Sequence, residues 1–399
     1  MAGDDRVIIA GAGPVGLVAA MRLADRGIPV LVMEASPDLP IDLRASTYHP
    51  PTLDILDQYG ITQMLIDDGL IAPTWQFRDR ESGERAVFDL GLIKDETAHP
   101  YRVQCEQHKM TRLIYKKIKD WDNVEIWFDA KVKKVGQDAN SVWAVVERGS
   151  EEVTVKGRYL IGADGASSAV RTTLDVGFDG VTYPEWFVQA TTPFEFRDYL
   201  PDLSLINYVT DSEEWFVLLR VIGKWRALFP SREGETQEEA IADESLQKRL
   251  NGIHKKAEPY EILHKTIYRI HQRVATTYNI GRAFLAGDAA HLNNPLGGMG
   301  MNGGIHDAVN ICDKLTAVWR GEGDESLFDL YTRQRQPIAV ENVQAQAERN
   351  RKLLNERDPK VRLANFRETQ RTAEDPELAR DFLLRSSMIE GLRRAETIV

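Results

Sequence analysis

The chain has 399 residues, of which 43% are hydrophobic, and carries a formal net charge of −11. This length and hydrophobic content allow a sizeable core and predict two domains. The acidic balance argues against a nucleic-acid-binding protein, which would present a basic face. The chain has 2 cysteines and 8 histidines without metal-ligand spacing, which argues against both a disulfide framework and a bound metal.

The N-terminus shows no basic stretch followed by an apolar stretch, so we expect no signal peptide. No apolar run approaches the roughly 20 residues that span a bilayer. These features predict a cytoplasmic protein without membrane contact.

The first predicted elements form a nucleotide-binding pattern. A short apolar strand leads into Gly11-Ala-Gly13-Pro-Val-Gly16 and an apolar helix, and a second apolar strand ends at Glu34. This is a complete G-x-G-x-x-G βαβ unit with a correctly placed acid. Gly11 would permit the tight turn, Gly13 the approach of a pyrophosphate, and Gly16 close packing of helix on strand. Glu34 would accept a hydrogen bond from a ribose hydroxyl. The pattern favours dinucleotide binding over a merely glycine-rich turn.

The segment after this unit carries Arg44 and His49 and opens a predicted helix at Thr52. Arg44 is either a surface residue or, so close to a cofactor strand, a partner for a phosphate or a reduced flavin. Residues 74–96 read as irregular and charge-rich, and a helix is predicted over residues 103–119.

Strands of a meander are predicted between residues 124 and 155. A further apolar strand ends in Asp164-Gly165, and a helix begins near Ser168. Residues 176–275 contain aromatic, strand-like segments that predict an antiparallel sheet, with an acidic helical insert over residues 237–250.

A late glycine-rich stretch completes the pattern. An apolar strand ends in Gly287-Asp288, and a loop rich in glycine precedes an amphipathic helix. Each glycine loses more backbone conformational entropy on folding than other residues, so a cluster of glycines calls for a structural reason. One such reason is a place where the main chain approaches a flat ligand at the positive end of a helix. Asp288 would then reach a sugar or ribityl hydroxyl, so we interpret the stretch as half of a flavin site.

These three motifs, in this order, resemble those of the single-component FAD-dependent aromatic hydroxylases, the group of para-hydroxybenzoate hydroxylase and phenol hydroxylase. The likeness covers about residues 5–360, and residues 268–302 look like the nitrophenol and hydroxyphenylpropionate hydroxylase branch. The resemblance implies FAD as the cofactor and NADH or NADPH as the co-substrate. The implied cofactor-binding residues are Gly11, Gly13, Gly16, Glu34, Arg44, Gln107, Val132, Asp164, Asp288, Gly298, Gly300, Met301 and Asn302.

Within that set, Arg44 and Gln107 resemble FAD-contacting residues of the family, and Val132 matches a main-chain contact to adenine. Asp164 matches an acid that serves FAD and the nicotinamide cofactor together. Residues 298–302 resemble the loop beside the isoalloxazine, where the helix start would stabilise negative charge on the flavin.

The fold class expected is α/β: a Rossmann-like FAD-binding domain with an inserted antiparallel-sheet substrate domain and C-terminal helices. The expected boundaries are residues 1–175 for the first part of the FAD-binding domain, 176–275 for the substrate domain, 276–365 for the return of the FAD-binding domain with helices, and 366–399 for a C-terminal helical tail.

The reaction implied is hydroxylation of a small phenolic or hydroxypyridine-type ring by O2 through a flavin C4a-hydroperoxide, in a possible homodimer. A base is then expected near the phenol. His49 is the candidate, because related enzymes carry an Asp at this place after the cofactor Arg and a histidine titrates in the right range. The equal alternative is that His49 only caps the helix that begins at Pro50.

Two other functions remain open. One is a different FAD-dependent oxidoreductase, either a reductase or a halogenase-like enzyme, although the W-x-W-x-I-P signature of halogenases is absent. The other is a non-catalytic flavin-binding module, which the aromatic middle domain could also serve. Phenol-stimulated NAD(P)H oxidation with oxygen uptake would separate them.

Overall fold

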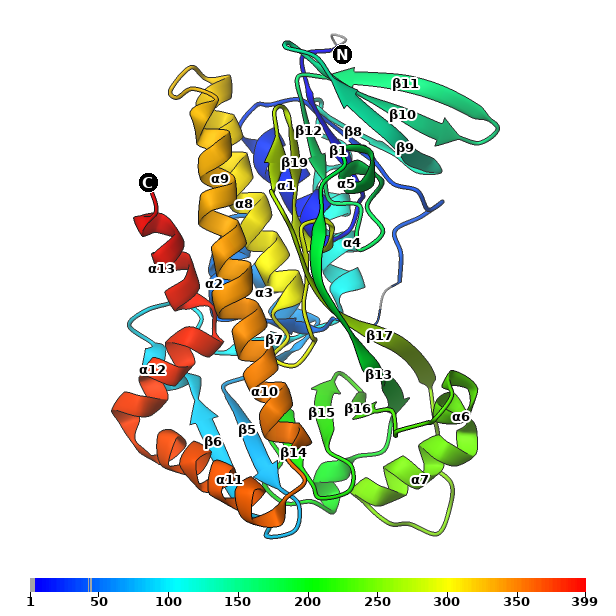
Figure 1. Ribbon diagram of the computed structural model, residues 1–399, viewed down its shortest axis with the longest axis vertical. Coiled ribbons are helices and arrows are strands. Elements are labelled where there is room, and N and C mark those ends of the chain that lie inside the picture. The colour runs from blue at the N-terminus through cyan, green and yellow to red at the C-terminus, as the bar shows by residue number, and fades with distance from the viewer. Residues whose placement is uncertain (1–3, 42, 44) are drawn as a thin grey trace.

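The computed structural model describes residues 4–41, 43 and 45–399, so the expectation for Arg44 lies outside the described residues. The molecule has two lobes along its long axis, one built on a parallel sheet and the other on a large, mainly antiparallel sheet (Figure 1). Two long strands, β13 (Phe178–Thr192) and β17 (His264–Ala275), run from one lobe into the other.

The first lobe is the predicted Rossmann-like unit. Its six-stranded sheet has the order β18-β19-β12-β1-β2-β8, and all neighbours except β18 and β19 are parallel. Every residue of β1 and β2 is buried, as expected for strands covered by helices on both faces. The strands are β1 (Val7–Ala10), β2 (Val30–Met33), β8 (Val124–Trp127), β12 (Tyr159–Gly162), β18 (Asn279–Ile280) and β19 (Ala283–Leu285).

Helix α1 (Pro14–Asp25) packs against α4 (Gln107–Ile118) on one side and α8 (Gly300–Trp319) on the other. Helix α4 begins later than the predicted residue 103, because residues 102–104 form strand β7 instead. Strand β7 (Arg102–Gln104) pairs with β3 (Thr47–Tyr48) and β4 (Leu70–Ala72) in a small sheet next to α2 (Pro50–Asp57) and α3 (Ile61–Asp67).

The predicted meander is an antiparallel sheet of β9 (Ala130–Gln137), β10 (Val142–Arg148) and β11 (Glu151–Gly157), with α5 (Ala169–Thr173) packed on β9. Strand β8, predicted as part of that meander, instead joins the parallel sheet beside β2.

The second lobe holds an eight-stranded sheet in the order β20-β17-β13-β16-β15-β14-β5-β6. The expectation that residues 74–96 are irregular is wrong, because β5 and β6 form one edge of this sheet. Trp75, Phe77 and Phe88 alternate with polar and charged residues there, and the charges mask the period of two in the sequence. The remaining strands are β5 (Thr74–Asp79), β6 (Arg85–Asp89), β14 (Ile206–Thr210), β15 (Phe216–Val221), β16 (Lys224–Pro230) and β20 (His291–Leu292).

The two faces of this sheet have different tasks. One face packs its core, which includes Trp225 and Leu218, under α6 (Gln237–Ile241) and α7 (Asp243–Ile253). The other face carries Tyr208 and Val217 towards the first lobe and the C-terminal helices. Those helices are α9 (Ser326–Ile338), the π-helical turn Ala339–Gln344, α10 (Ala345–Asn355), α11 (Pro359–Glu374), α12 (Pro376–Ser386) and α13 (Ile389–Thr397).

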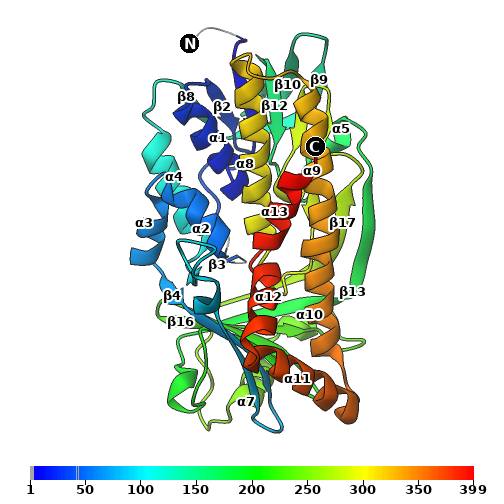
Figure 2. The same ribbon diagram turned by 90° about the vertical axis from the view of Figure 1, so that its left-hand side faces the viewer.

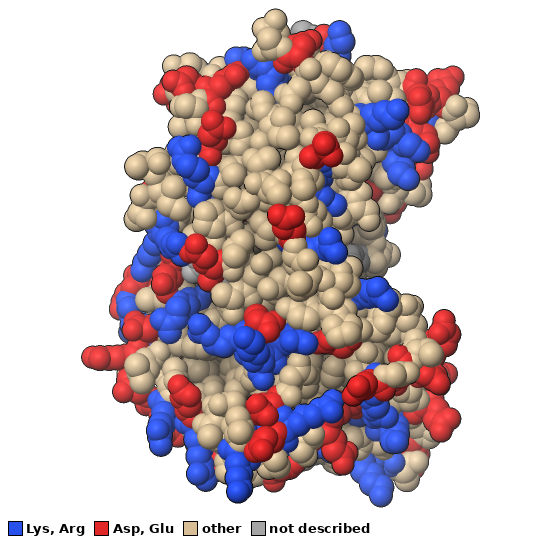
Figure 3. Space-filling view, viewed as in Figure 1, with Lys and Arg blue, Asp and Glu red and all other residues tan. Residues whose placement is uncertain are grey.

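The C-terminal helices cover the sheet edge formed by β5 and β6 (Figure 2). Pro359 and Pro376 stand in the first turns of α11 and α12, where Asp358 and Asp375 cap the exposed amides. On the face shown in Figure 3, Lys and Arg are interleaved with Asp and Glu. Within the described part of the chain, no helix is long and apolar enough to cross a membrane.

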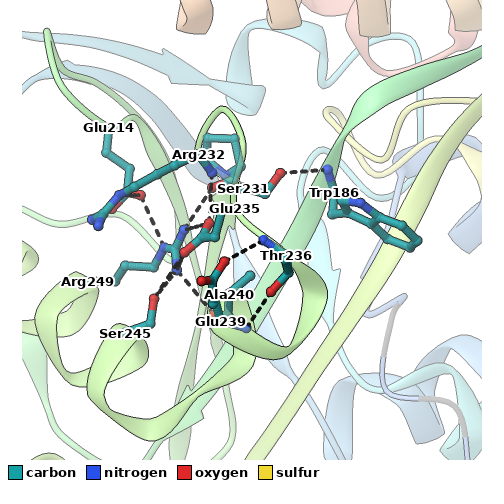
Figure 4. Close-up of polar contacts among 11 residues, drawn as sticks. Trp186, Glu214, Ser231, Arg232, Glu235, Thr236, Glu239, Ala240, Ser245 and Arg249 are labelled. Atoms are coloured by element: carbon teal, nitrogen blue, oxygen red, sulfur yellow. Dashed lines mark hydrogen bonds and ion pairs between the residues drawn. The ribbon is translucent and has the colours of Figure 1, made fainter.

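An arginine clasp fixes the helical insert to the sheet (Figure 4). The Arg249 side chain of α7 is fully buried and donates to Glu214 (3.1 Å), Glu235 (2.7 Å) and Ser245 (2.6 Å). These partners come from the β14–β15 loop, the β16–α6 loop and α7, so one guanidinium ties three segments together.

Candidate functional site

A cavity of about 710 Å³ lies between the two lobes. One wall consists of the carboxyl ends of β1, β2 and β12 with the loops that follow them and the loop before α8. The opposite wall is the inner face of the large sheet, at β13 to β17. Ligands of open α/β sheets bind at the carboxyl ends of the strands, so this is the expected place for a cofactor.

The glycines of the first motif form a cradle at one end of this cavity. Gly11 has φ +98°, and a Cβ there would lie 2.4 Å from the Ala163 carbonyl oxygen. A Cβ on Gly16 would lie 2.0 Å from the Gly11 oxygen, so Gly16 allows the helix to pack on the strand. Gly13 lines the cavity, and a Cβ there would meet no protein atom within 4 Å among the described residues. That geometry fits the close approach of a pyrophosphate to the start of α1.

Two acids border this cradle. Glu34 lines the cavity at the end of β2, where its carboxylate accepts hydrogen bonds from the amides of Ala12 (2.8 Å) and Ser36 (2.9 Å). Asp164 lines the cavity after β12 and accepts from the Ser168 hydroxyl at 2.5 Å. Burial raises the pKa of Asp164, and the Ser168 hydrogen bond opposes that shift. Both carboxylates thus brace glycine turns at the cavity wall, and Glu34 is near the place where a dinucleotide ribose would lie.

Most of the other predicted cofactor residues also line the cavity. Helix α8 begins at Gly300, so its positive end faces the space. Gly298 has φ +67°, and its ideal Cβ position lies 3.1 Å from Thr47 Cβ, which leaves little room for a side chain. The cavity-lining members of this group are Gln107, Val132, Asp288, Gly298, Gly300 and Met301.

Asn302 has a different position from the one expected, because its buried side chain lies behind the loop and off the cavity wall. Its Nδ2 donates to the carbonyl oxygens of Thr47 (2.9 Å) and Gly298 (2.8 Å), and its Oδ1 accepts from the His49 amide (2.9 Å). The Asn302 side chain therefore clamps the loop before α8 onto β3. A cofactor contact by this residue would have to come from its main chain.

His49 is fully buried and does not line the cavity. It holds the N-cap position of α2, but its side chain makes no capping hydrogen bond. Its Nε2 lies 2.9 Å from the Gly297 carbonyl oxygen, so this nitrogen carries the proton when the ring is neutral. Burial, reinforced by the charge of Arg102, lowers the pKa of His49 well below its ordinary value. The main chain of His49 caps α2, because its carbonyl oxygen accepts from the Thr52 and Leu53 amides, whereas its side chain contacts the loop before α8; its role as the base stays a prediction.

The sheet wall supplies side chains that the sequence did not single out. Val217, Leu219, Leu228 and Ile270 make it largely apolar, and Gln189 and Arg226 add polar groups. Successive side chains of a strand point to opposite faces of the sheet, and Trp225 of β16 points into the core under α6 and α7. This alternation was the sequence signal that could have placed Arg226 on the cavity face.

Tyr208 stands on this wall with a buried arginine behind it. The Arg102 guanidinium contacts Tyr208 and lies 4.9 Å over the Trp75 ring, and burial lowers the pKa of Arg102 to about 10. Burial raises the pKa of Tyr208, whereas Arg102 and the Gly297 amide oppose that shift. The phenol of Tyr208 is thus held between a cation and the loop before α8.

A second buried cluster anchors the turn at Gly287 and Asp288 to α8. Asp307 accepts from His291 Nε2 (2.7 Å), Arg335 Nε (2.8 Å) and the Gly287 amide (3.2 Å). His291 therefore packs beneath the Gly-Asp turn. The roles of Asp307 and Arg335 depend on contacts between segments that are distant in the sequence, which no local motif encodes.

A glycine cradle, acids at the strand ends and a helix N-terminus facing an apolar wall define a dinucleotide-binding oxidoreductase with an enclosed substrate space. The chain belongs to the family described as "FAD binding domain", whose model matches residues 4–346.

Three relatives agree with this assignment. Para-nitrophenol 4-monooxygenase of Pseudomonas sp. (strain WBC-3) is 31% identical over 403 residues and covers 98% of each chain. The 6-hydroxy-3-succinoylpyridine 3-monooxygenase HspB of Pseudomonas putida is 32% identical over 366 residues, covering 90% of this chain and 91% of its own. The crystal structure of p-nitrophenol 4-monooxygenase PnpA from Pseudomonas putida DLL-E4 superposes with a TM-score of 0.91 at 29% identity, covering 98% of this chain and 99% of that one.

The chain is accordingly an FAD-dependent aromatic monooxygenase, and the resemblance stated from its motifs is confirmed. The residues present fit the cofactor: Gly13 leaves space for a pyrophosphate, and the start of α8 faces the cavity. These similarities do not favour the alternative functions, which were a reductase, a halogenase-like enzyme and a non-catalytic flavin-binding module.

Proposed function

We propose that the protein hydroxylates a small phenolic ring bound between the loop before α8 and the inner face of the large sheet, with NADH or NADPH as reductant. The observation that carries the proposal is the pairing of an apolar sheet wall with the buried phenol of Tyr208 beside that loop. Bound FAD would supply hydride acceptance and activation of O2. The protein supplies binding, orientation and exclusion of water.

The cofactor would be held by residues of the first lobe. Gly11, Gly13 and Gly16 shape the turn for the pyrophosphate, and Glu34 is proposed to bind the adenosine ribose after exchanging part of its loop contacts. The contacts proposed for Gln107, Val132, Asp164, Asp288, Gly298, Gly300 and Met301 are supported by their positions on the cavity wall. The positive end of α8 would stabilise negative charge on the reduced ring.

Tyr208 replaces His49 as the group proposed to contact the substrate hydroxyl. Its phenol can exchange hydrogen bonds with the substrate, and Arg102 behind it favours negative charge at this end of the cavity. His49 is proposed to act through the loop, because its ring proton holds the Gly297 carbonyl. It is therefore a positioning residue.

The proposal is tested with a panel of phenols and hydroxypyridines added to the FAD-loaded enzyme, following NAD(P)H oxidation, oxygen uptake and product mass together. Phenols are expected to stimulate NAD(P)H oxidation and to gain one oxygen atom. If phenols only stimulate hydrogen peroxide formation while hydroxypyridines are hydroxylated, the proposed substrate class is wrong.

A cytoplasmic location and a homodimer also remain proposals. The location is supported by the state of Cys105 and Cys312, which are both buried free thiols as a reducing compartment allows. Cell fractionation tests the location. Light scattering of the FAD-loaded protein tests the dimer, and a monomeric mass across working concentrations would exclude it.

A further inference from the structure

One sheet edge of the first lobe lies away from the cavity. Strands β9, β10 and β11 form a sheet that stands out from this lobe, and β11 is its outer strand (Figure 1). None of the described residues of β11 lines the cavity. A free edge strand presents main-chain N–H and C=O groups that can pair with a strand of another chain. The edge of β11 is therefore a candidate interaction surface.

The main-chain groups of Glu152, Thr154 and Lys156 point outward from this edge. Strands β10 and β11 are joined by the two-residue turn 149–150. The residues that flank such a turn exchange both hydrogen bonds with each other, so alternate residues beyond them face away from the neighbouring strand. In agreement, the Lys156 carbonyl oxygen accepts a hydrogen bond from Arg6 Nε (3.2 Å), and Arg6 belongs to no strand of this sheet.

The sequence of this edge is complementary to itself. Val153 and Val155 stand on either side of Thr154, and Glu152 and Lys156 stand one place further out. If two copies of β11 pair antiparallel about a twofold axis at Thr154, Glu152 of each copy lies opposite Lys156 of the other. Each valine then lies opposite a valine. A second copy of this chain therefore matches the edge in both charge and shape.

Glu152 has an unfavourable neighbour within its own sheet. The residue directly opposite it on β10 is Glu147, and like charges in such a pair destabilise a sheet. Glu147 pairs with Lys133 at 2.9 Å, whereas the exposed Glu152 and Lys156 form no ion pair with any residue that the structure describes. A cation brought by a second copy would offset the repulsion at Glu152.

We propose that β11 is the contact through which two copies of this chain form a dimer, with the two edge strands antiparallel and centred on Thr154. The two three-stranded sheets then join into one continuous sheet. A strand of 7 residues covers less than the roughly 1,600 Å² of a standard interface, so we expect a dissociation constant of micromolar order. The inference names the interface of the proposed homodimer and rests on that proposal, but it does not depend on the proposed hydroxylation.

Charge reversal at the edge tests this contact in the FAD-loaded protein. Glu152→Lys and Lys156→Glu each turn two attractive pairs into repulsive ones, because the twofold axis doubles every change. Sedimentation velocity over a range of concentrations should give a dimer dissociation constant at least roughly tenfold higher in each variant. The double variant Glu152→Lys/Lys156→Glu is self-complementary again, and its dissociation constant should return to within about threefold of that of the unaltered protein.

Lys134→Glu is the matched control for net charge. Lys134 is exposed and lies on β9, and its register through Val145 to Thr154 places it on the same face of the sheet. It should leave the dissociation constant within about twofold. Thr154→Pro is a second variant that changes no charge: it removes one outward N–H and should also weaken the dimer. Bound FAD and the circular dichroism spectrum check that each variant is folded.

Three results would overturn the interface while leaving a dimer in place. They are a dimer that tolerates both single reversals, a double reversal that fails to restore the dimer, and equal weakening by Lys134→Glu. A monomeric mass of the unaltered protein at every concentration would exclude the homodimer together with its interface. None of these results bears on hydroxylation, which product formation in the same samples measures separately.

Discussion

Two glycines of the first motif have opposite structural tasks, and substitution should separate them. Gly13 has an ordinary φ of −71° and open space where a Cβ would stand, so Gly13→Ala should fold with its free energy of unfolding changed by no more than about 0.5 kcal/mol. The added methyl lies where a pyrophosphate would approach, and the dissociation constant for FAD should rise at least roughly tenfold.

Gly16→Ala is the contrasting variant. Its Cβ would collide with the Gly11 carbonyl oxygen, so the apoprotein should lose about 1–3 kcal/mol or more of stability. Urea unfolding of both apoproteins and FAD titration measure the two effects. A destabilised Gly13→Ala with unaltered FAD affinity would refute the division of roles.

His49→Asn tests whether this residue positions the loop or takes a proton. Because the ring is buried, neutral and hydrogen-bonded to Gly297, we expect kcat to fall by the same factor at every pH while bound FAD is retained. The measurement is the pH profile of kcat and of kcat/KM. The disappearance of one limb of the profile would instead identify His49 as the base.

Residues in short local motifs could be predicted from the sequence, and residues that depend on strand pairing could not. Gly11, Glu34 and Asp164 occupy fixed places in strand–turn–helix units, so their spacing in the sequence was sufficient to predict that they lie together at the cavity. Gln189 and Arg226 are neighbours only because β13 pairs with β16. His49 was chosen for its chemistry and its place in the chain, and neither revealed that Gly297 and Asn302 enclose it.

At the scale of elements, the Arg249 clasp should dominate the attachment of α7. Arg249→Ala leaves the partly buried Glu235 without this cation and Glu214 with only the exposed Arg232, and we expect a loss of about 3–5 kcal/mol in the free energy of unfolding. Arg232→Ala is the matched control, since Arg232 also pairs with Glu214 but is 44% exposed, and it should cost no more than about 1 kcal/mol. Equal losses in denaturant unfolding would show that burial is not the cause.

The contact between α2 and α8 should make the fold sensitive to acid. His306 lies 3.0 Å from the Thr52 hydroxyl, and burial, reinforced by Arg335, lowers the pKa of His306 to about 3. Between its unfolded pKa of about 6.5 and its folded value, only the unfolded chain binds this proton, so stability falls as pH decreases through that window.

The slope of unfolding free energy against pH should therefore be smaller in His306→Asn by up to about 1.4 kcal/mol per pH unit between pH 6 and about 4. At pH 8 the imidazole is neutral in both states, so the variant shows only the cost of altered packing there. An unchanged slope would mean that His306 is protonated in the folded protein.

Helices and strands could be predicted from the sequence where their apolar residues followed one periodicity, either that of a helix or that of a strand. Strands β13 to β16 and the βαβ unit show clear patterns, and proline with aspartate marks the starts of α11 and α12. Strands β5 and β6 were missed because charged residues share their short segments, and β7 was absorbed into a predicted helix. Strand β5 pairs with the distant β14, and β7 pairs with the distant β4, which no local pattern encodes, whereas β6 is held to β5 in a hairpin.

At the scale of the whole molecule, the active space exists because two sheets face each other across a cavity. The parallel sheet presents its carboxyl ends and the start of α8, and the large sheet presents an apolar wall with polar ends. The long strands β13 and β17 belong to both lobes and fix their separation. The order of motifs predicted the cofactor wall, whereas the substrate wall emerged only from the sheet order.

The central claim is that oxygen from O2 enters an aromatic substrate in this cavity. The direct measurement is product mass after turnover under ¹⁸O₂ with FAD, NAD(P)H and a phenol that stimulates NAD(P)H oxidation. We predict one ¹⁸O atom per molecule of hydroxylated product, with NAD(P)H consumption close to product formed. Label found only in peroxide or water, with the phenol recovered unchanged, would contradict the account.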